Sequence, residues 1–202
     1  MWRALRIDEA ALPVYLFAMF IEFEETPNPD TLKFLPGREV LVRGTREYRN
    51  REAAARSPLA LRLFDLDGVT AVFLATDFVS VSRAEGVAWD DLKPDILTAL
   101  MEHFTSGAPV VEEDEAAGSV ADGLEGEIER QIVELLDTRV KPAVAMDGGN
   151  IEFVEFDDGV VYLRLEGACA GCPSSTMTLK QGIETMLKHY VPEVQRVEPV
   201  DY

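Results

Sequence analysis

The sequence is poor in cysteine and histidine. Its 202 residues include only two cysteines, Cys169 and Cys172, and two histidines, His103 and His189. A secreted protein of this size without other cysteines would gain little stability from one disulfide across so short a loop. We therefore expect a reducing compartment, in which the two thiols have a chemical role other than a structural disulfide.

Positive charge is also scarce, with 19 Lys and Arg against 37 Asp and Glu, which gives a net charge of −18. So acidic a chain is a poor counterion for phosphates or anionic lipids, which excludes nucleic-acid or membrane-surface binding as its main function. Long apolar runs are missing as well. The longest candidate, residues 10–20, contains Pro13 and falls short of the ~20 residues that cross a bilayer.

The charge pattern divides the chain into two parts. Residues 110–126 contain six acidic residues and no basic one, together with glycine and small residues, which is typical of a linker. We predict an N-terminal extension over residues 1–18, a first domain over 19–109, an acidic linker over 110–123 and a second domain over 124–202. Both domains are expected to be small and of the α+β class.

The first domain is predicted to hold several strands and two helices. The first helix is expected to begin at Ser57-Pro58 and the second to be capped by Asp90 and to end before Gly107, because these residues favour helix ends. The expected strands occupy residues 20–24, 31–35, 69–74 and 78–82, and the strand over residues 31–35 is expected to be half-buried. No catalytic cluster is evident in this part of the chain.

The second domain is predicted to follow the order α-β-β-α-β. Its first helix begins near Leu124 and is expected to break over residues 140–150, which contain a proline and two adjacent glycines. Strands at 151–156 and 160–165 flank an Asp-Gly turn, which indicates a hairpin. A helix over residues 174–190 and a last strand near Val197 complete the order.

The segment with the clearest chemistry is residues 169–173, Cys-Ala-Gly-Cys-Pro, between a predicted strand end and a helix start. Two thiols at this spacing can bind one metal atom. The N–H groups and dipole at the start of the helix favour thiolates, and Ser174, Ser175 and Thr176 add further donors. Thiol–disulfide exchange, as in thioredoxin-like enzymes, and two structural cysteines are the alternatives.

The ligand count points to two chains. Zinc and iron–sulfur sites usually take four protein ligands, and this chain offers two thiolates. His189 lies far along the following helix, and His103 lies in the other domain. A full shell therefore predicts a symmetric homodimer with the metal between the subunits, as a labile cluster or as a zinc bridge.

These residues resemble a known family. Residues 146–151, 161–165 and 167–180 are similar to the NifU-like (Nfu-type) C-terminal domain, and residues 23–34, with 63–82, are similar to the Nfu N-terminal domain. The resemblance covers nearly everything from Met19 onward. It implies an iron–sulfur cluster scaffold or carrier, and not an enzyme, of the α+β class.

The family implies roles for specific residues and partners. Cys169 and Cys172 would bind a labile [4Fe-4S] cluster, or a [2Fe-2S] cluster, that bridges two subunits. Apo iron–sulfur proteins would receive the cluster, and an upstream scaffold or donor would supply it. Extra cysteines of the longer NifU proteins are missing, which favours a carrier downstream of a primary scaffold. The N-terminal domain is expected to recruit clients or donors.

Two further predictions concern the compartment and the paired glycines. Asp8 and Glu9 closely follow Arg3 and Arg6, unlike a targeting presequence, so we expect a bacterial cytoplasmic protein, with the mitochondrial matrix as the alternative. Residues 147–150, Asp-Gly-Gly-Asn, are interpreted as a turn before a strand, although they could also shape the cluster loop.

Overall fold

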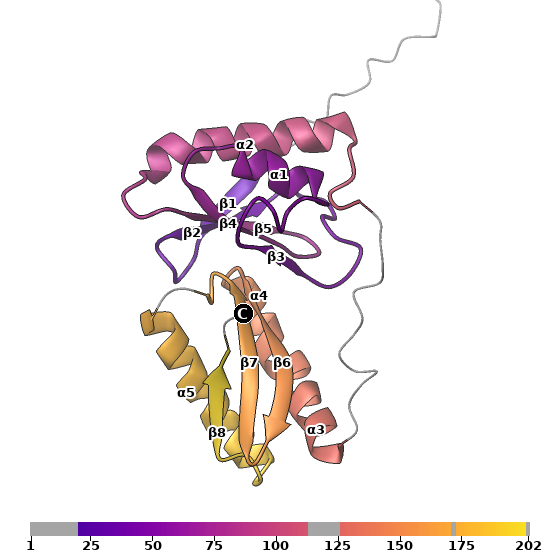
Figure 1. Ribbon diagram of the computed structural model, residues 1–202, viewed down its shortest axis with the longest axis vertical. Coiled ribbons are helices and arrows are strands. Elements are labelled where there is room, and N and C mark those ends of the chain that lie inside the picture. The colour runs from indigo at the N-terminus through magenta and orange to yellow at the C-terminus, as the bar shows by residue number, and fades with distance from the viewer. Residues whose placement is uncertain (1–19, 113–125, 171–172, 201–202) are drawn as a thin grey trace, which may run out of the picture.

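The computed structural model describes residues 20–112, 126–170 and 173–200, with no side-chain detail for residues 173–175. It consists of two α+β domains stacked end to end, each with helices on a sheet (Figure 1). The predicted α+β class with two domains is thus confirmed. The boundaries assigned from the sequence stay predictions, and residues 1–18 lie outside the described residues.

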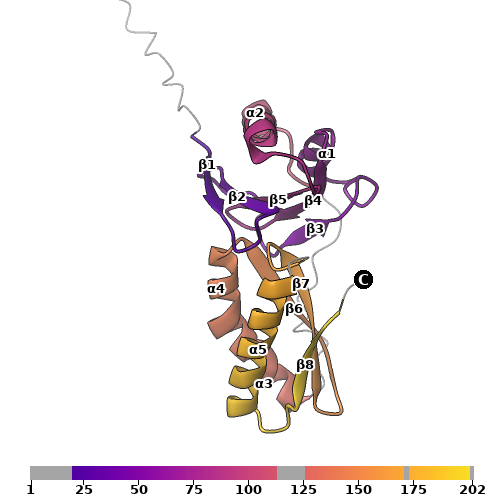
Figure 2. The ribbon, with the colours of Figure 1, turned by 90° about the vertical axis from the view of Figure 1, so that its left-hand side faces the viewer.

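The N-terminal domain is built on a five-stranded antiparallel sheet in the order β1-β2-β5-β4-β3. Two helices lie on one face of it (Figure 2). The strands are β1 (Glu22–Glu25), β2 (Thr31–Leu35), β3 (Arg46–Tyr48), β4 (Val69–Leu74) and β5 (Val79–Arg83), and the helices are α1 (Pro58–Phe64) and α2 (Trp89–Ser106).

The structure confirms the predicted start of α1 and the predicted end of α2, but it corrects the residue that caps the start of α2. Ser57 caps α1 as expected, since its hydroxyl accepts the Ala60 N–H at 3.2 Å. The prediction that Asp90 caps α2 is wrong, because the cap residue is Ala88 and Asp90 lies in the first turn, where its charge favours the helix dipole. Gly107 ends α2 in the left-handed conformation at φ 71°, as expected.

Alternation along the strands gives the five-stranded sheet two different faces. Leu32, Phe34 and Val81 point into the core beneath α1 and α2. Lys33 and Ser80, one position along, lie on the opposite face and are 7% and 1% exposed. Both faces of the sheet are therefore covered. As a result β2 is almost wholly buried, whereas the sequence predicted a half-buried strand.

The C-terminal domain packs helices on one face of a three-stranded sheet in the order β6-β7-β8 (Figure 2). Strands β6 (Gly149–Asp157) and β7 (Val160–Gly167) form the antiparallel hairpin that the sequence predicts, and β8 (Arg196–Pro199) pairs parallel with β7. The long helix α5 (Pro173–Tyr190) connects β7 to β8. The buried residues between these layers include Ile151, Leu163, Ile183 and Leu187.

The predicted break over residues 140–150 is wrong in its position. Helix α3 (Glu127–Leu135) runs through a π-helical segment, η2 (Leu136–Val140), into α4 (Lys141–Met146), and the chain turns only at Asp147 and Gly148. Pro142 falls in the first turn of α4, where its missing N–H removes no necessary hydrogen bond. The wider π turn allows the proline to be accommodated without ending the helix.

Within the described residues, no helix combines the length and apolar character needed to cross a membrane.

Candidate functional site

The cysteine loop follows β7 through a tight turn at the end of the C-terminal domain that faces the N-terminal domain (Figure 1). Gly167 adopts φ +62°, which favours glycine, and it allows Cys169 N–H and Ala170 N–H to donate back to the carbonyls of Glu166 and Gly167. The Thr176 hydroxyl, in the first turns of α5, donates to the Cys169 carbonyl at 3.2 Å. Strand end and helix start therefore both hold the first cysteine in place.

Of the two predicted ligands, the structure places Cys169, whereas Cys172 lies outside the described residues. Cys169 is a free thiol with 7% of its surface exposed, and it packs with the core of the C-terminal domain. Its sulfur lies close to Gly149, because a methyl group added there would be 2.5 Å from Sγ. Cys169 is therefore buried in this conformation.

The protonation of Cys169 also differs from the sequence-based expectation. Burial raises the pKa of the thiol to about 12, and the negative charge of Asp147 acts in the same direction. We expected the start of the following helix to favour the thiolate. In this conformation desolvation outweighs that effect, so the first cysteine is a neutral thiol at physiological pH.

A cavity of about 480 Å³ lies beside the thiol, and residues from both domains line it. The N-terminal domain contributes Pro27, from the turn between β1 and β2. The other lining residues come from α4, the cysteine loop and α5: Val144, Asp147, Ala168, Cys169, Thr178 and Leu179. The thiol therefore has space on one side, bounded in part by the other domain.

Side chains of the N-terminal domain donate to backbone carbonyls around the cysteine loop. The Asn28 amide donates to Ala170 O at 3.0 Å, immediately after Cys169. The Lys33 ammonium donates to Met146 O at 3.1 Å, and the Ser80 hydroxyl donates to Gly148 O at 2.7 Å. No role for Asn28 or Ser80 was evident from the sequence, because each lies in an ordinary turn or strand pattern.

A second group of contacts involves the end of the β6–β7 hairpin. The Gly167 N–H donates to Glu47 Oε1 at 2.9 Å. The Thr45 hydroxyl donates to Glu166 Oε2 at 3.2 Å, and the Asn150 amide donates to the same oxygen at 3.0 Å. Burial raises the pKa of Glu166, which is 7% exposed, although the hydrogen bond from Asn150 opposes this.

Glycine is required at two positions near the cysteine loop, because the backbone turns there and the N-terminal domain packs closely against it. Gly148 adopts φ +80°, and a methyl group there would lie 3.0 Å from Ser80 Oγ and 3.3 Å from Lys33 Cβ. A methyl group on Gly167 would lie 2.6 Å from Gly148 O and 3.0 Å from the Phe73 ring. The turn interpretation therefore holds for Asp147 and Gly148, whereas Gly149 and Asn150 already lie in β6. Contact with the other domain is an additional requirement at Gly148.

The two histidines contribute nothing to this site. His103 is fully buried in the N-terminal domain, and His189 lies near the far end of α5, next to Tyr190. Among the residues that the structure describes, no group of three or more His, Cys, Asp or Glu side chains could hold a metal ion. Among the described residues, Cys169 is the side chain of this loop whose thiolate suits an iron–sulfur site.

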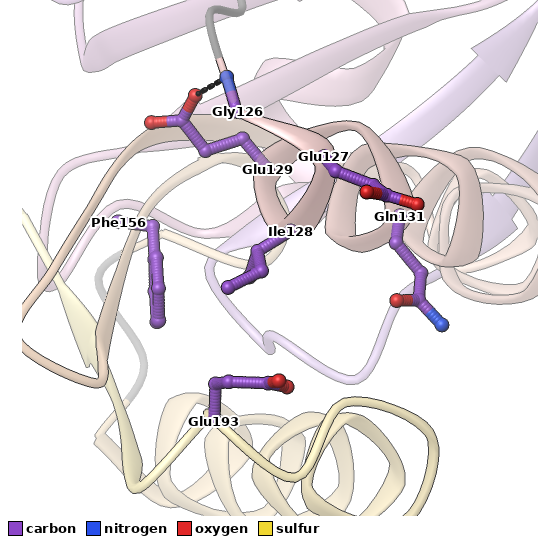
Figure 3. A pocket seen from close by; sticks show the side chains of 7 residues that line it. All are labelled: Gly126, Glu127, Ile128, Glu129, Gln131, Phe156 and Glu193. Atoms are coloured by element: carbon purple, nitrogen blue, oxygen red, sulfur yellow. Dashed lines mark hydrogen bonds between the residues drawn. The ribbon is translucent and has the colours of Figure 1, made fainter.

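A second cavity, of about 840 Å³, lies at the opposite end of the C-terminal domain (Figure 3). It is bordered by the start of α3, where the Gly126 N–H donates to Glu129 Oε2 at 3.1 Å. Its lining includes Glu127, Glu129, Glu193 and the Phe156 ring but no thiol, histidine or basic residue. This acidic hollow offers no chemistry related to the cysteine loop.

Comparison with known proteins agrees with the resemblance found in the sequence. The family model for the NifU-like domain matches residues 132–198, and that for the Nfu/NifU scaffold protein N terminus matches residues 21–107. The human mitochondrial NFU1 iron-sulfur cluster scaffold homolog is 46% identical over 90% of this chain and 72% of its own length. Mitochondrial NifU-like protein 4 of Arabidopsis thaliana is 46% identical over 89% of this chain and 65% of its own length. The chain therefore belongs to the Nfu-type family of NifU-like iron–sulfur cluster scaffold proteins.

Proposed function

We propose that this protein binds a labile [4Fe-4S] cluster between two subunits and transfers it to apo-proteins. Membership of the scaffold family supports a cluster carrier and not an enzyme. The observation that carries the finer proposal is the ligand count. The chain has two cysteines, and Cys169 lies on the loop between β7 and α5. A four-thiolate shell therefore needs Cys169 and Cys172 from each of two chains.

Loading begins with a change at Cys169. Iron binds a thiolate, so the buried, neutral thiol has to lose its proton and become accessible before it can act as a ligand. Transfer then proceeds by ligand exchange. A thiolate of the client attacks iron, and Cys169 and Cys172 leave one after the other as the subunits separate. A [2Fe-2S] cluster would fit the same ligand set.

The cluster is cargo, and its donor and acceptor are other proteins. We propose an upstream scaffold or donor as the source, apo iron–sulfur proteins as clients, and the N-terminal domain as the part that recruits them. Unchanged transfer to every client after deletion of residues 1–109 would contradict that role. The matched relatives are named as mitochondrial proteins, which supports the mitochondrial alternative and gives no support to the bacterial cytoplasm.

Anaerobic reconstitution with ferrous iron and sulfide tests the proposal. About four irons and four sulfides per two chains, eluting with a dimer and active in transfer to an apo [4Fe-4S] enzyme, is the expected result. Two irons per two chains would correct the cluster type. A colourless monomer without iron that reduces disulfides catalytically would contradict the proposal and favour a thiol–disulfide oxidoreductase. One zinc per two chains would indicate a structural bridge instead.

A further inference from the structure

The face of the N-terminal sheet opposite α1 and α2 contacts the cysteine-loop end of the C-terminal domain, here defined as residues 146–150 and 166–170 (Figure 1). Three side chains on this side of the domain, Asn28, Lys33 and Ser80, each donate to a backbone carbonyl of that end. We call these three residues the cap donors. Because they bind backbone carbonyls, they recognise the shape of the loop and not its side chains.

The contact is close but mostly polar. Gly148 and Gly167 lie so near the sheet that a methyl group on either would be within about 3 Å of Ser80 or Phe73. Among the described residues, the apolar cluster at this boundary is small and consists of Phe73, Ala75 and Phe78 with Ala145. The two large cores lie inside the separate domains. Interfaces of this kind within a chain separate readily, so this contact is expected to open and close.

The same end of the C-terminal domain has to meet a second chain when a cluster is shared. One chain supplies two thiolates of four, so the partner's cysteine loop has to approach within the length of a cluster. In this structure the N-terminal domain occupies the side of the cysteine loop from which the partner would approach. Asn28 is bonded to the residue after Cys169, and Pro27 borders the cavity beside the thiol. The docked domain and the partner subunit therefore need the same space.

We propose that the N-terminal domain is a reversible cap, which docks on the cysteine loop through the cap donors and competes with the partner subunit for it. The inference rests on the proposed two-chain cluster. In the capped monomer Cys169 is shielded from oxidants and free metal ions. Undocking exposes the loop for dimer formation and frees the sheet face for other proteins.

Alkylation of Cys169 by iodoacetamide measures cap opening without any iron. The assay uses the full chain with Cys172→Ser, so that Cys169 is the one thiol that iodoacetamide can alkylate. Lys33→Ala combined with Ser80→Ala removes two cap donors. Alkylation is expected to become about 25-fold faster, since each lost hydrogen bond changes a two-state ratio by about fivefold. Small-angle X-ray scattering should show a larger radius of gyration.

A second variant should weaken docking of the N-terminal domain by exchanging one side-chain nitrogen atom for oxygen. Asn28→Asp keeps the oxygen that accepts the Asp30 N–H at 3.0 Å, so the turn is retained. It replaces the amide that donates to Ala170 O with a carboxylate oxygen, which repels that carbonyl. Alkylation should again accelerate. Because the sheet is untouched, this variant separates cap opening from unfolding of the N-terminal domain.

A matched control comes from α2, on the other side of the sheet. Lys93 lies over the Phe23 ring at 4.3 Å, as Lys33 lies over Phe78 at 4.9 Å, and the Thr98 hydroxyl donates to a backbone carbonyl, as Ser80 does. Lys93→Ala with Thr98→Ala should leave the alkylation rate unchanged. Alkylation rates within twofold of the parent rate for both Asn28→Asp and the Lys33/Ser80 variant would contradict the proposed cap.

Competition is tested separately by cluster loading with both cysteines present. The open variants should form the cluster-bound dimer faster than the parent and reach the same final iron content. Faster alkylation without faster dimer formation would overturn the competition. Failure of every variant, including the parent, to bind iron would contradict the proposed function and would leave the alkylation result interpretable.

Discussion

Gly149 lies against the Cys169 thiol, and its replacement by alanine tests how tightly the start of β6 holds the cysteine loop. The φ of Gly149 is not positive, so alanine is allowed by the backbone and the cost is steric. The added methyl group would lie 2.5 Å from Cys169 Sγ, 2.8 Å from Glu166 O and 3.0 Å from Cys169 N. Two of these atoms belong to the backbone, so rotation of one side chain cannot relieve the overlap.

Overpacking of this kind costs typically 1–3 kcal/mol, and three close contacts place Gly149→Ala near the upper limit, at about 3 kcal/mol. Urea denaturation monitored by far-UV circular dichroism measures the loss. With a slope of about 1 kcal/mol/M, the midpoint of the C-terminal domain should fall by about 3 M. The loop should shift, and iron binding should fall with it.

Gly182→Ala is the matched control in the same domain. Gly182 lies within α5, and a methyl group there has no heavy atom within 4 Å outside its own helix turn. Alanine in a helix interior should stabilise by up to about 1 kcal/mol. If Gly149→Ala unfolds within about 0.5 M urea of the parent, the close packing of β6 on the cysteine loop is not what holds Cys169 in place.

Three further changes have expected outcomes. Cys169→Ala should abolish iron retention after reconstitution while circular dichroism stays that of the folded parent, and normal iron content would contradict its role as ligand. Burial, with the charges of Arg62 and Arg38, lowers the pKa of His103, whose ring nitrogens have no hydrogen-bond partner among the described residues. Its stabilising effect is therefore present above pH ~6.5 and lost as the pH falls, so His103→Leu should flatten the decline of thermal stability between pH 7 and pH 5. Burial raises the pKa of Glu166, so its contribution is present below the unfolded-state pKa and lost as the pH rises through the folded-state pKa. Glu166→Gln keeps an acceptor for Thr45 and Asn150, so the urea midpoint of the variant should rise relative to that of the parent between pH 5 and pH 8.

Local patterns predicted the elements that carry the site. The strand expected over residues 31–35 matches β2, the Asp-Gly turn matches the β6–β7 hairpin, and the helix expected over residues 174–190 matches α5. These features depend on periodicity and turn chemistry, which act over a few residues. Strand β3 was missed because three residues with one buried side chain give no periodic signal.

The features that the sequence did not predict depend on contacts between distant residues. Lys33 looked like the polar side of a half-buried strand, yet it is buried because the other domain covers it. The start of α5 was expected to lower the pKa of the nearby thiols, but burial raises that of Cys169. The strength of desolvation depends on which atoms surround a group, and these come from separate parts of the chain.

The sequence by itself determined the family, the α+β class and the two cysteines, whose number is the basis of the proposed second chain. Each of these follows from residue identity and spacing, which folding does not change. Only the tertiary structure decided that Cys169 is buried and that Asn28, Lys33 and Ser80 cover its loop. The first arises from packing in the core of the C-terminal domain, and the second from the docking of two surfaces more than 60 residues apart in the chain, for which no local pattern exists.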